Sequence, residues 1–146
     1  MTPFYNVEAA KWAEQNAGSA YPDLTIKQRE LLILAVSEFI QKSKTLSYVK
    51  DLLLKEFDPA QAEVIAVTEI TRAYAHAVLI EGEKLGKEFP GVKVIKSWST
   101  TNDAYVCPIC KDLDGKEVDI DNAFAEGIFI PPAHEGCRCW IESCTT

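Results

Sequence analysis

Along the first third of the chain, apolar residues recur every three or four positions, which is the spacing of one face of an amphipathic helix. This pattern predicts three helices, over about residues 6–15, 26–43 and 45–56. Thr25 and Gln28 have the spacing of a capping box, in which two side chains satisfy backbone groups at the start of a helix. We therefore expect residues 1–57 to form an N-terminal helical region.

A longer helix is predicted to start at residue 58. Asp58 suits the N-cap, Pro59 suits the first helical position, and the Gln61 side chain can fold back to the cap. The pattern remains helical to about Gly82 or Gly86, and it is apolar on most sides. Because a helix that is apolar nearly all round is buried, we expect this segment to be the central helix of the fold.

The pattern changes after Pro90-Gly91, where alternating apolar residues indicate short strands. Strands are predicted over about residues 92–98, 116–120 and 137–142, with turns and loops between them. Helices followed by strands indicate an α+β fold rather than an alternating parallel sheet. The predicted fold has N-terminal helices and a long central helix packed on a small, mainly antiparallel sheet with a Cys/His-rich loop region.

Length and composition fit a globular protein of one domain, or of one domain with a small helical appendage. The 146 residues are 47% hydrophobic and 25% charged, which excludes a disordered chain. We divide the sequence into residues 1–57 and a second region of residues 58–146. No run of 18 or more apolar residues occurs, so no membrane-spanning helix is expected. The first residues do not resemble a secretory signal, so we expect a reducing compartment, in which cysteines are thiols or metal ligands.

The net charge of −7 is distributed unevenly. Residues 1–57 hold seven basic and seven acidic side chains, whereas residues 58–146 hold eight basic and fifteen acidic ones and carry the whole surplus. Binding to a nucleic-acid duplex needs a basic face, because neutralisation of phosphates supplies much of the affinity. Direct nucleic-acid binding by this chain alone is therefore not expected.

The cysteines supply the clearest candidate chemistry. Cys107 and Cys110 form a Cys-x-x-Cys turn, and His134, Cys137 and Cys139 lie close together further along the chain. A tight turn with two sulfurs and a second pair of ligands from a distant loop is typical of a structural zinc site. We expect zinc to be bound by the first two cysteines with His134 and Cys137, across 23 intervening residues, with Cys139 as an alternative ligand.

The sequence also allows other states of the same cysteines. Disulfides inside a mature extracellular particle, or free thiols in a packed cluster, are the alternatives to zinc. A thioredoxin-type redox turn would need the first cysteine at the start of a helix, whose dipole stabilises a thiolate. The residues after Cys110 are instead expected to form a turn. No other residue indicates an activated Cys–His nucleophile.

Polar residues interrupt the predicted central helix. Glu69 and Arg72 are three positions apart and can pair on one face. Because a buried charge needs a partner, this structural polar patch is expected to tie the helix to the strand that follows it; a docking or ligand-binding surface is the alternative. His76 is interpreted as a histidine with its hydrogen bonds satisfied rather than as a ligand.

Three separated motifs in the second region resemble the phage Mu F-type head morphogenesis domain, which occurs in minor capsid proteins of tailed phages and prophages. The motifs are Val67–Tyr74, Trp98–Asp103 continued by Val106–Cys110 and Leu113–Lys116, and Pro131–Cys139. The resemblance covers about residues 58–142. It implies a minor head protein, a non-enzymatic structural component that acts near the portal in head assembly, genome packaging or genome delivery.

The same resemblance implies portal and other head proteins as partners, and the virion or the host cytoplasm as the location. Two alternatives differ in class. Arg72, Ser99-Thr100-Thr101 and Glu117 are loosely similar to the residue order of ADP-ribosyltransferase-like or toxin-associated enzymes, although threonine stands where that pattern has its second serine. A zinc-stabilised protein-binding module is the further alternative.

Overall fold

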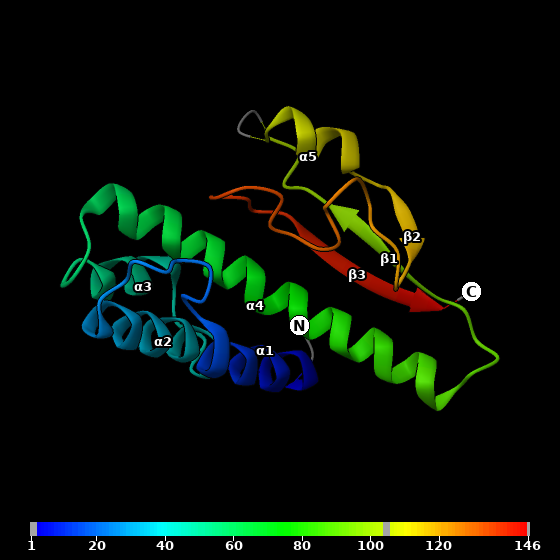
Figure 1. The fold of residues 1–146 in the computed structure, drawn as a ribbon, viewed down its shortest axis with the longest axis horizontal. Helices are drawn as coiled ribbons and strands as arrows, with labels where there is room; N and C mark the ends of the chain where they lie inside the picture. The colour runs from blue at the N-terminus through cyan, green and yellow to red at the C-terminus, as the bar shows by residue number, and fades with distance from the viewer. Residues whose placement is uncertain (1–2, 104–105, 146) are drawn as a thin grey trace.

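The computed structural model describes residues 3–103 and 106–145, with residues 3–6 described by their backbone alone. The elements follow in the order α1 (Pro3–Asn16), α2 (Ile26–Gln41), α3 (Leu46–Leu53), α4 (Pro59–Glu88), β1 (Val94–Ser99), α5 (Pro108–Leu113), β2 (Glu117–Asp119) and β3 (Trp140–Thr145). In Figure 1, α4 runs between the helices α1–α3 and the small sheet. The predicted α+β fold is confirmed.

Both predicted capping boxes are present. The Thr25 Oγ1 accepts from the Gln28 backbone N–H at 3.1 Å, and the Gln28 side chain accepts from the Thr25 N–H at 3.0 Å. At the start of α4, the Asp58 carboxylate accepts from the Gln61 N–H at 2.9 Å, and the Gln61 side chain accepts in return. These caps fix where α2 and α4 begin, because each satisfies backbone donors that the helix itself leaves unpaired.

Helix α4 continues beyond both glycines at which it was expected to end. A Cβ atom at Gly82 would lie 2.6 Å from the Ile120 Cδ1, closer than side chains tolerate. Gly82 is therefore a point of close approach between α4 and the residue that follows β2, rather than a helix terminator. The helix extends to Glu88, and the chain turns at Pro90-Gly91 as predicted.

The buried apolar residues form two clusters, one on each side of the fold. The larger contains residues of α1–α4 and includes Leu32, Val49 and Ala73. The smaller lies between the sheet and the cysteine loops and includes Trp98 and Phe124. Among the other helices, α4 makes its most extensive contact with α1.

The sheet has the strand order β2-β1-β3, and both pairings are antiparallel. Ser97 of β1 lies opposite Glu117 of β2 on one side and Glu142 of β3 on the other. The closing strand starts at Trp140, three residues later than predicted, so Cys137 and Cys139 lie in the loop before it. This arrangement leaves β3 as one edge of the sheet.

The turn predicted after Cys110 was wrong. Residues 108–113 form the short helix α5, with Cys107 as its N-cap and Pro108 at its first position. The Cys107 Sγ accepts from the Cys110 backbone N–H at 3.4 Å. A cysteine can take the place of serine at an N-cap because its sulfur, although a weak acceptor, still reaches the free N–H groups of the first turn.

Within the described residues, no helix combines the length and the apolar character needed to cross a membrane. The division of the chain at residue 57 stays a prediction. The larger core cluster nevertheless contains side chains from both sides of that point, such as Leu53 and Ala66.

Replacing Ala73 with leucine should destabilise the helical part. Ala73 on α4 is fully buried in the larger cluster, so the added methylene groups have no free space. We expect the free energy of unfolding to fall by about 1–3 kcal/mol, as is usual for overpacking. Urea unfolding measures this change. An unchanged free energy would contradict the tight packing of α4 on its neighbours.

Candidate metal centre

The five predicted ligands come together beside α5, in two groups that share one cysteine. Cys107, Cys110 and His134 form one group, and Cys110, Cys137 and Cys139 form the other. Within each group, the ligand atoms all lie within 4.8 Å of one another. The loops that sequence analysis paired across 23 intervening residues are therefore neighbours, and Cys110 lies at the centre.

Distances around Cys110 fit a shared metal ion. Its Sγ is 3.4 Å from the His134 Nε2 and 3.8 Å from the Cys137 Sγ. A disulfide would need the two sulfurs at about 2.05 Å, and all five cysteines are free thiols. Cys110, Cys137 and Cys139 are buried, whereas His134 is exposed. The cluster could hold a metal ion.

The thiols influence one another strongly. A hydrogen bond from Cys139 lowers the pKa of Cys137 to about 5, against the opposing effect of burial. The same contact with Cys137, together with burial, raises the pKa of Cys139. Burial and the contact with Cys107 raise the pKa of Cys110 to about 12. Thiols that are buried this close together favour one shared negative charge, which a bound cation would stabilise.

Helix α4 holds the second ligand loop in place through two threonines. The Thr68 Oγ1 accepts from the Gly136 backbone N–H at 2.8 Å, and the Thr71 hydroxyl donates to the Cys137 carbonyl at 2.8 Å. Sequence analysis placed both residues in the first motif without assigning them a role. The first and the last motif therefore meet at the cysteine cluster.

Glu69 and Arg72 pair in the structure, but not as a link to the sheet. The Arg72 Nη1 lies 2.8 Å from the Glu69 Oε2, and the Glu69 carboxylate also accepts from the Gly18 backbone N–H at 2.8 Å. The guanidinium reaches the Ser19 hydroxyl and lies 4.8 Å from the centre of the Trp12 ring. The pair connects α4 to α1 and to the turn after it. Burial raises the pKa of Glu69, while Arg72 and the Gly18 N–H oppose that change.

His76 stacks on Trp12, with ring centroids 4.7 Å apart. Burial and the nearby Arg72 lower its pKa to about 4. The unfolded chain binds this proton at about pH 6.5, so the folded state favours the neutral ring. The resulting stabilisation is complete above about pH 6.5 and is lost as the pH falls toward 4.

We therefore expect the His76 ring to remain neutral down to pH 5.5. The protein has only two histidines, so ring-proton shifts in an NMR titration resolve them, and a His76→Gln variant assigns the signals. A midpoint near 6.5 would contradict the buried stack on Trp12.

A buried lysine is the feature that sequence analysis missed. Lys96 of β1 is fully buried; its Nζ donates to the Phe129 carbonyl at 2.7 Å and lies 5.2 Å from the centre of the Phe124 ring. Burial lowers its pKa. The burial of Lys96 could have been predicted from the alternation of side chains along the strand, because Val94 and the buried Trp98 lie on the same face as Lys96. Lys96 fixes the loop that leads from β2 to the second group of ligands.

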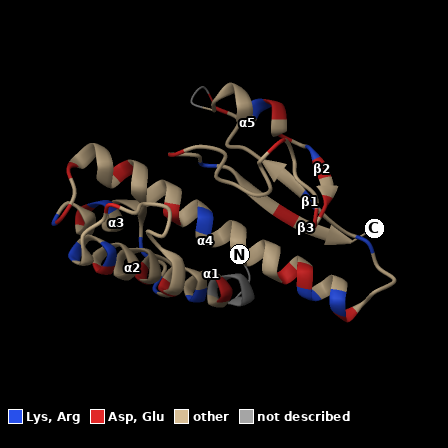
Figure 2. Cartoon of the chain, viewed as in Figure 1, with Lys and Arg blue, Asp and Glu red and all other residues tan. Residues whose placement is uncertain are grey.

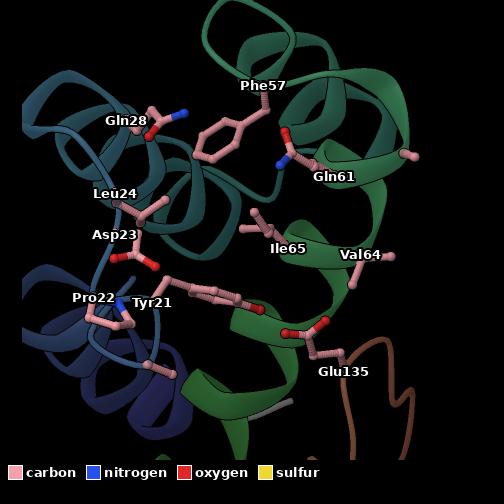
Figure 3. Close-up of a pocket in the computed structure, with 12 residues that line it drawn as sticks. Tyr21, Pro22, Asp23, Leu24, Gln28, Phe57, Gln61, Val64, Ile65 and Glu135 are labelled. Atoms are coloured by element: carbon pink, nitrogen blue, oxygen red, sulfur yellow. The ribbon is translucent and has the colours of Figure 1, made fainter.

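A hollow of the surface lies away from the sulfurs, beside the start of α4. Figure 3 shows this cavity of about 620 Å³ with Tyr21, Phe57, Ile65 and Glu135 around it. Its lining is mostly apolar, and Gln28 and Gln61 at its rim already take part in the helix caps. This hollow brings together no nucleophile with a base, so it supports no assignment beyond a surface depression.

Charge is distributed as the sequence indicates. Figure 2 shows acidic residues, in red, on α5, β2 and β3, in the half of the protein that contains the cluster. Arg138 in the second ligand loop donates to Asp103 at 3.0 Å.

Comparison with known proteins gives one match. Residues 27–142 match a family model described as Phage Mu protein F like protein. This range includes the three motifs, and it begins in α2 rather than at residue 58, where the resemblance was expected to start. No curated protein and no solved structure matches the chain.

Proposed function

The chain belongs to the Phage Mu protein F like family, and from this membership we propose that it is a minor head protein of a phage or prophage. Membership indicates a phage structural protein. The proposal adds that the chain is a non-enzymatic component that acts near the portal in head assembly, packaging or genome delivery. It would then be located in the virion and, before assembly, in the host cytoplasm.

One observation carries this proposal: the family motifs meet at the cysteine cluster, where residues of one motif bind the main chain of another. Thr68 and Thr71 of the first motif bind the loop of the last motif, and the middle motif supplies Cys107 and Cys110 to the same cluster. These contacts connect α4 to the loop of the last motif, which supports a structural role for the motifs.

The test is co-purification of this chain with a portal protein of the same phage or prophage. We expect the two proteins to associate under packaging conditions. The variant Cys144→Ser, which changes an exposed cysteine outside the cluster, is the control and should associate equally well. No association, with the fold intact by circular dichroism, would count against a role near the portal.

The ADP-ribosyltransferase-like alternative gains no support from the contacts. Arg72 is paired with Glu69 at the interface of α1 and α4, whereas Thr100 and Glu117 belong to the sheet region. Incubation with labelled NAD and host extract separates the two classes, because a head protein should transfer no label.

We further propose that the cluster holds one structural zinc ion through Cys107, Cys110, His134 and Cys137, with Cys139 as the alternative fourth ligand. Zinc bound to sulfur at about 2.3 Å in a tetrahedron places two sulfurs about 3.8 Å apart, and a sulfur about 3.5 Å from a histidine nitrogen. The two distances measured from the Cys110 Sγ, 3.8 Å and 3.4 Å, agree with this geometry. The ion would supply a cross-link between the two loops.

The orientation of the His134 ring is suited to binding a metal ion. The His134 Nδ1 contacts the Glu135 carbonyl at 2.8 Å, an arrangement that leaves Nε2 to face the sulfurs. A zinc-stabilised protein-binding module would use the same ligands and would differ only in its partner. Metal analysis of the purified protein, together with a free-thiol count, tests the zinc assignment.

A further inference from the structure

The outer edge of β3 is a free strand edge. Strand β1 has β2 on one side and β3 on the other, and no strand among the described residues pairs with the far side of β3. In Figure 1, β3 is the strand nearest to α4. A free edge presents unpaired N–H and C=O groups, which can accept another extended chain.

Main-chain hydrogen bonds show which residues of β1 point toward β2. The Trp98 N–H donates to the Lys116 carbonyl at 3.0 Å, and the Trp98 carbonyl accepts from the Gly115 N–H at 2.8 Å. The Val94 carbonyl accepts from the Ile120 N–H at 3.1 Å. Main-chain groups alternate in direction along a strand. The N–H and C=O groups of Ile95 and Ser97 therefore point toward β3 instead.

This alternation fixes the outward groups of β3. Ser97 points toward β3 and lies opposite Glu142, so Glu142 exchanges its main-chain hydrogen bonds with β1. Its neighbours Ile141 and Ser143 therefore direct their N–H and C=O groups away from the sheet. Within the described part of the chain, no hydrogen bond reaches these outward groups. They are two residues apart, which is the spacing that a further strand would match.

Beside this edge lies an apolar groove of about 560 Å³. Ile70, Tyr74 and Val78 of α4 form one wall, and residues 139–143 form the other. Four residues of β3 border it, a length of about 13 Å. The groove therefore has room for a short extended segment that pairs with β3 and turns alternate side chains toward α4.

The charge and the apolar lining of the groove indicate which kind of peptide segment would bind there. Glu142 is the one charged residue among the described residues that line it, and the region of residues 58–146 carries the whole surplus of −7. An extended segment with apolar residues at alternate positions and lysine or arginine between them complements both features. A second copy of this chain would bring two Glu142 side chains and two acidic surfaces together, which disfavours self-pairing.

We propose that the free edge of β3, with Ile141 and Ser143 as its main-chain donors and acceptors, is a docking site for a basic, apolar-alternating extended segment of a partner protein. The segment adds a fourth strand to the sheet and lies against α4. This inference concerns the sheet edge itself and holds whether or not the partner belongs to a phage head.

The probe is a synthetic eight-residue peptide that alternates valine with lysine and has blocked ends. We expect it to protect the amides of Ile141 and Ser143 from hydrogen exchange, while those of Glu142 and Cys144 are slow already in the free protein. A peptide with methylated nitrogens on the side that faces β3 should bind at least about tenfold more weakly, because it lacks the donors. A peptide with glutamate in place of lysine should also bind more weakly.

Two variants locate the site. Ser143→Pro removes an outward N–H and spares the ladder to β1, a substitution that edge strands tolerate, and should weaken binding about tenfold. Glu142→Lys should weaken binding of the lysine peptide and strengthen binding of the glutamate peptide. Glu117→Lys makes the same charge change on the opposite edge strand and should leave both affinities nearly unchanged.

Several results would overturn the proposal. One is equal binding of the methylated and unmethylated peptides; another is slow exchange of the Ile141 and Ser143 amides in the free protein. Concentration-dependent dimers that protect the same amides would assign the edge to a second copy of this chain. If Ser143→Pro proves unfolded by circular dichroism, the methylated peptide and Glu142→Lys still decide the outcome.

Discussion

Replacing Cys110 with serine is expected to abolish metal binding and to loosen residues 106–142 while the helical part remains folded. Cys110 belongs to both ligand groups, so its loss disrupts the site whichever cysteine is the fourth ligand. A structural zinc ion can supply on the order of 10 kcal/mol of folding free energy in small domains. Because α1–α4 have their own core cluster, the loss should be confined to the sheet region. Hydrogen exchange, read segment by segment, measures it.

A chelator separates loss of metal from loss of packing. In the original chain, a chelator should produce the same loosening as the substitution, whereas the Cys110→Ser variant should be insensitive to it. Cys107→Ser and Cys137→Ser should resemble Cys110→Ser. The exposed Cys144 lies in β3 outside both groups, so Cys144→Ser is the matched control and should change nothing measurable. Equal stability with and without chelator, in protein with free thiols and no metal, would refute the zinc assignment.

The second large effect is expected at Glu69. Its carboxylate is fully buried, and it neutralises Arg72 and binds the Gly18 N–H. Glu69→Ala would leave a largely buried guanidinium and a backbone donor without their acceptor. We expect the free energy of unfolding to fall by about 3–5 kcal/mol, the usual cost of removing one partner of a buried pair. Chemical unfolding followed by circular dichroism measures the change.

Glu63 of the same helix provides the control. Its Oε1 lies 3.5 Å from the Lys50 Nζ, and its side chain is 63% exposed. Glu63→Ala should therefore lower the free energy of unfolding by less than about 1 kcal/mol. Glu69→Gln should be milder than Glu69→Ala, because the amide oxygen can still accept from the Gly18 N–H. The double variant with Arg72→Ala should recover part of the loss. If Glu69→Ala cost no more than Glu63→Ala, the buried connection between α4 and α1 would be wrong.

Elements that depend on local chemistry could be predicted from the sequence. The capping boxes at Thr25 and Asp58 were recognisable because a cap involves residues only three positions apart. The Cys-x-x-Cys turn and the distant His134 loop were recognisable as one cluster because metal ligands must converge, whatever the path between them. The order of helices and strands was sufficient to identify the α+β class.

Errors arose where a contact with a distant residue, or an unusual helix cap, decides the local structure. Gly82 is a helix-ending residue by local rules, yet it lies within α4, where the close approach of Ile120 leaves no room for a side chain. The segment after Cys107 has several turn-forming residues, but a sulfur cap and Pro108 start a helix there. Lys96 has the polarity of a surface residue, and only the carbonyl of Phe129 and two aromatic rings make its burial acceptable.

The sequence by itself determined the fold class, the starts of α2 and α4, the family and the set of candidate ligands, because each depends on residue type at short spacing. Tertiary structure alone decided that Cys110 is shared between two groups, that Glu69 connects α4 to α1, and that Ile141 and Ser143 face outward from the edge of the sheet. These features depend on which surfaces meet when α4 packs between the helices and the sheet. Burial, strand register and ligand distance arise from that packing, and local sequence does not contain them.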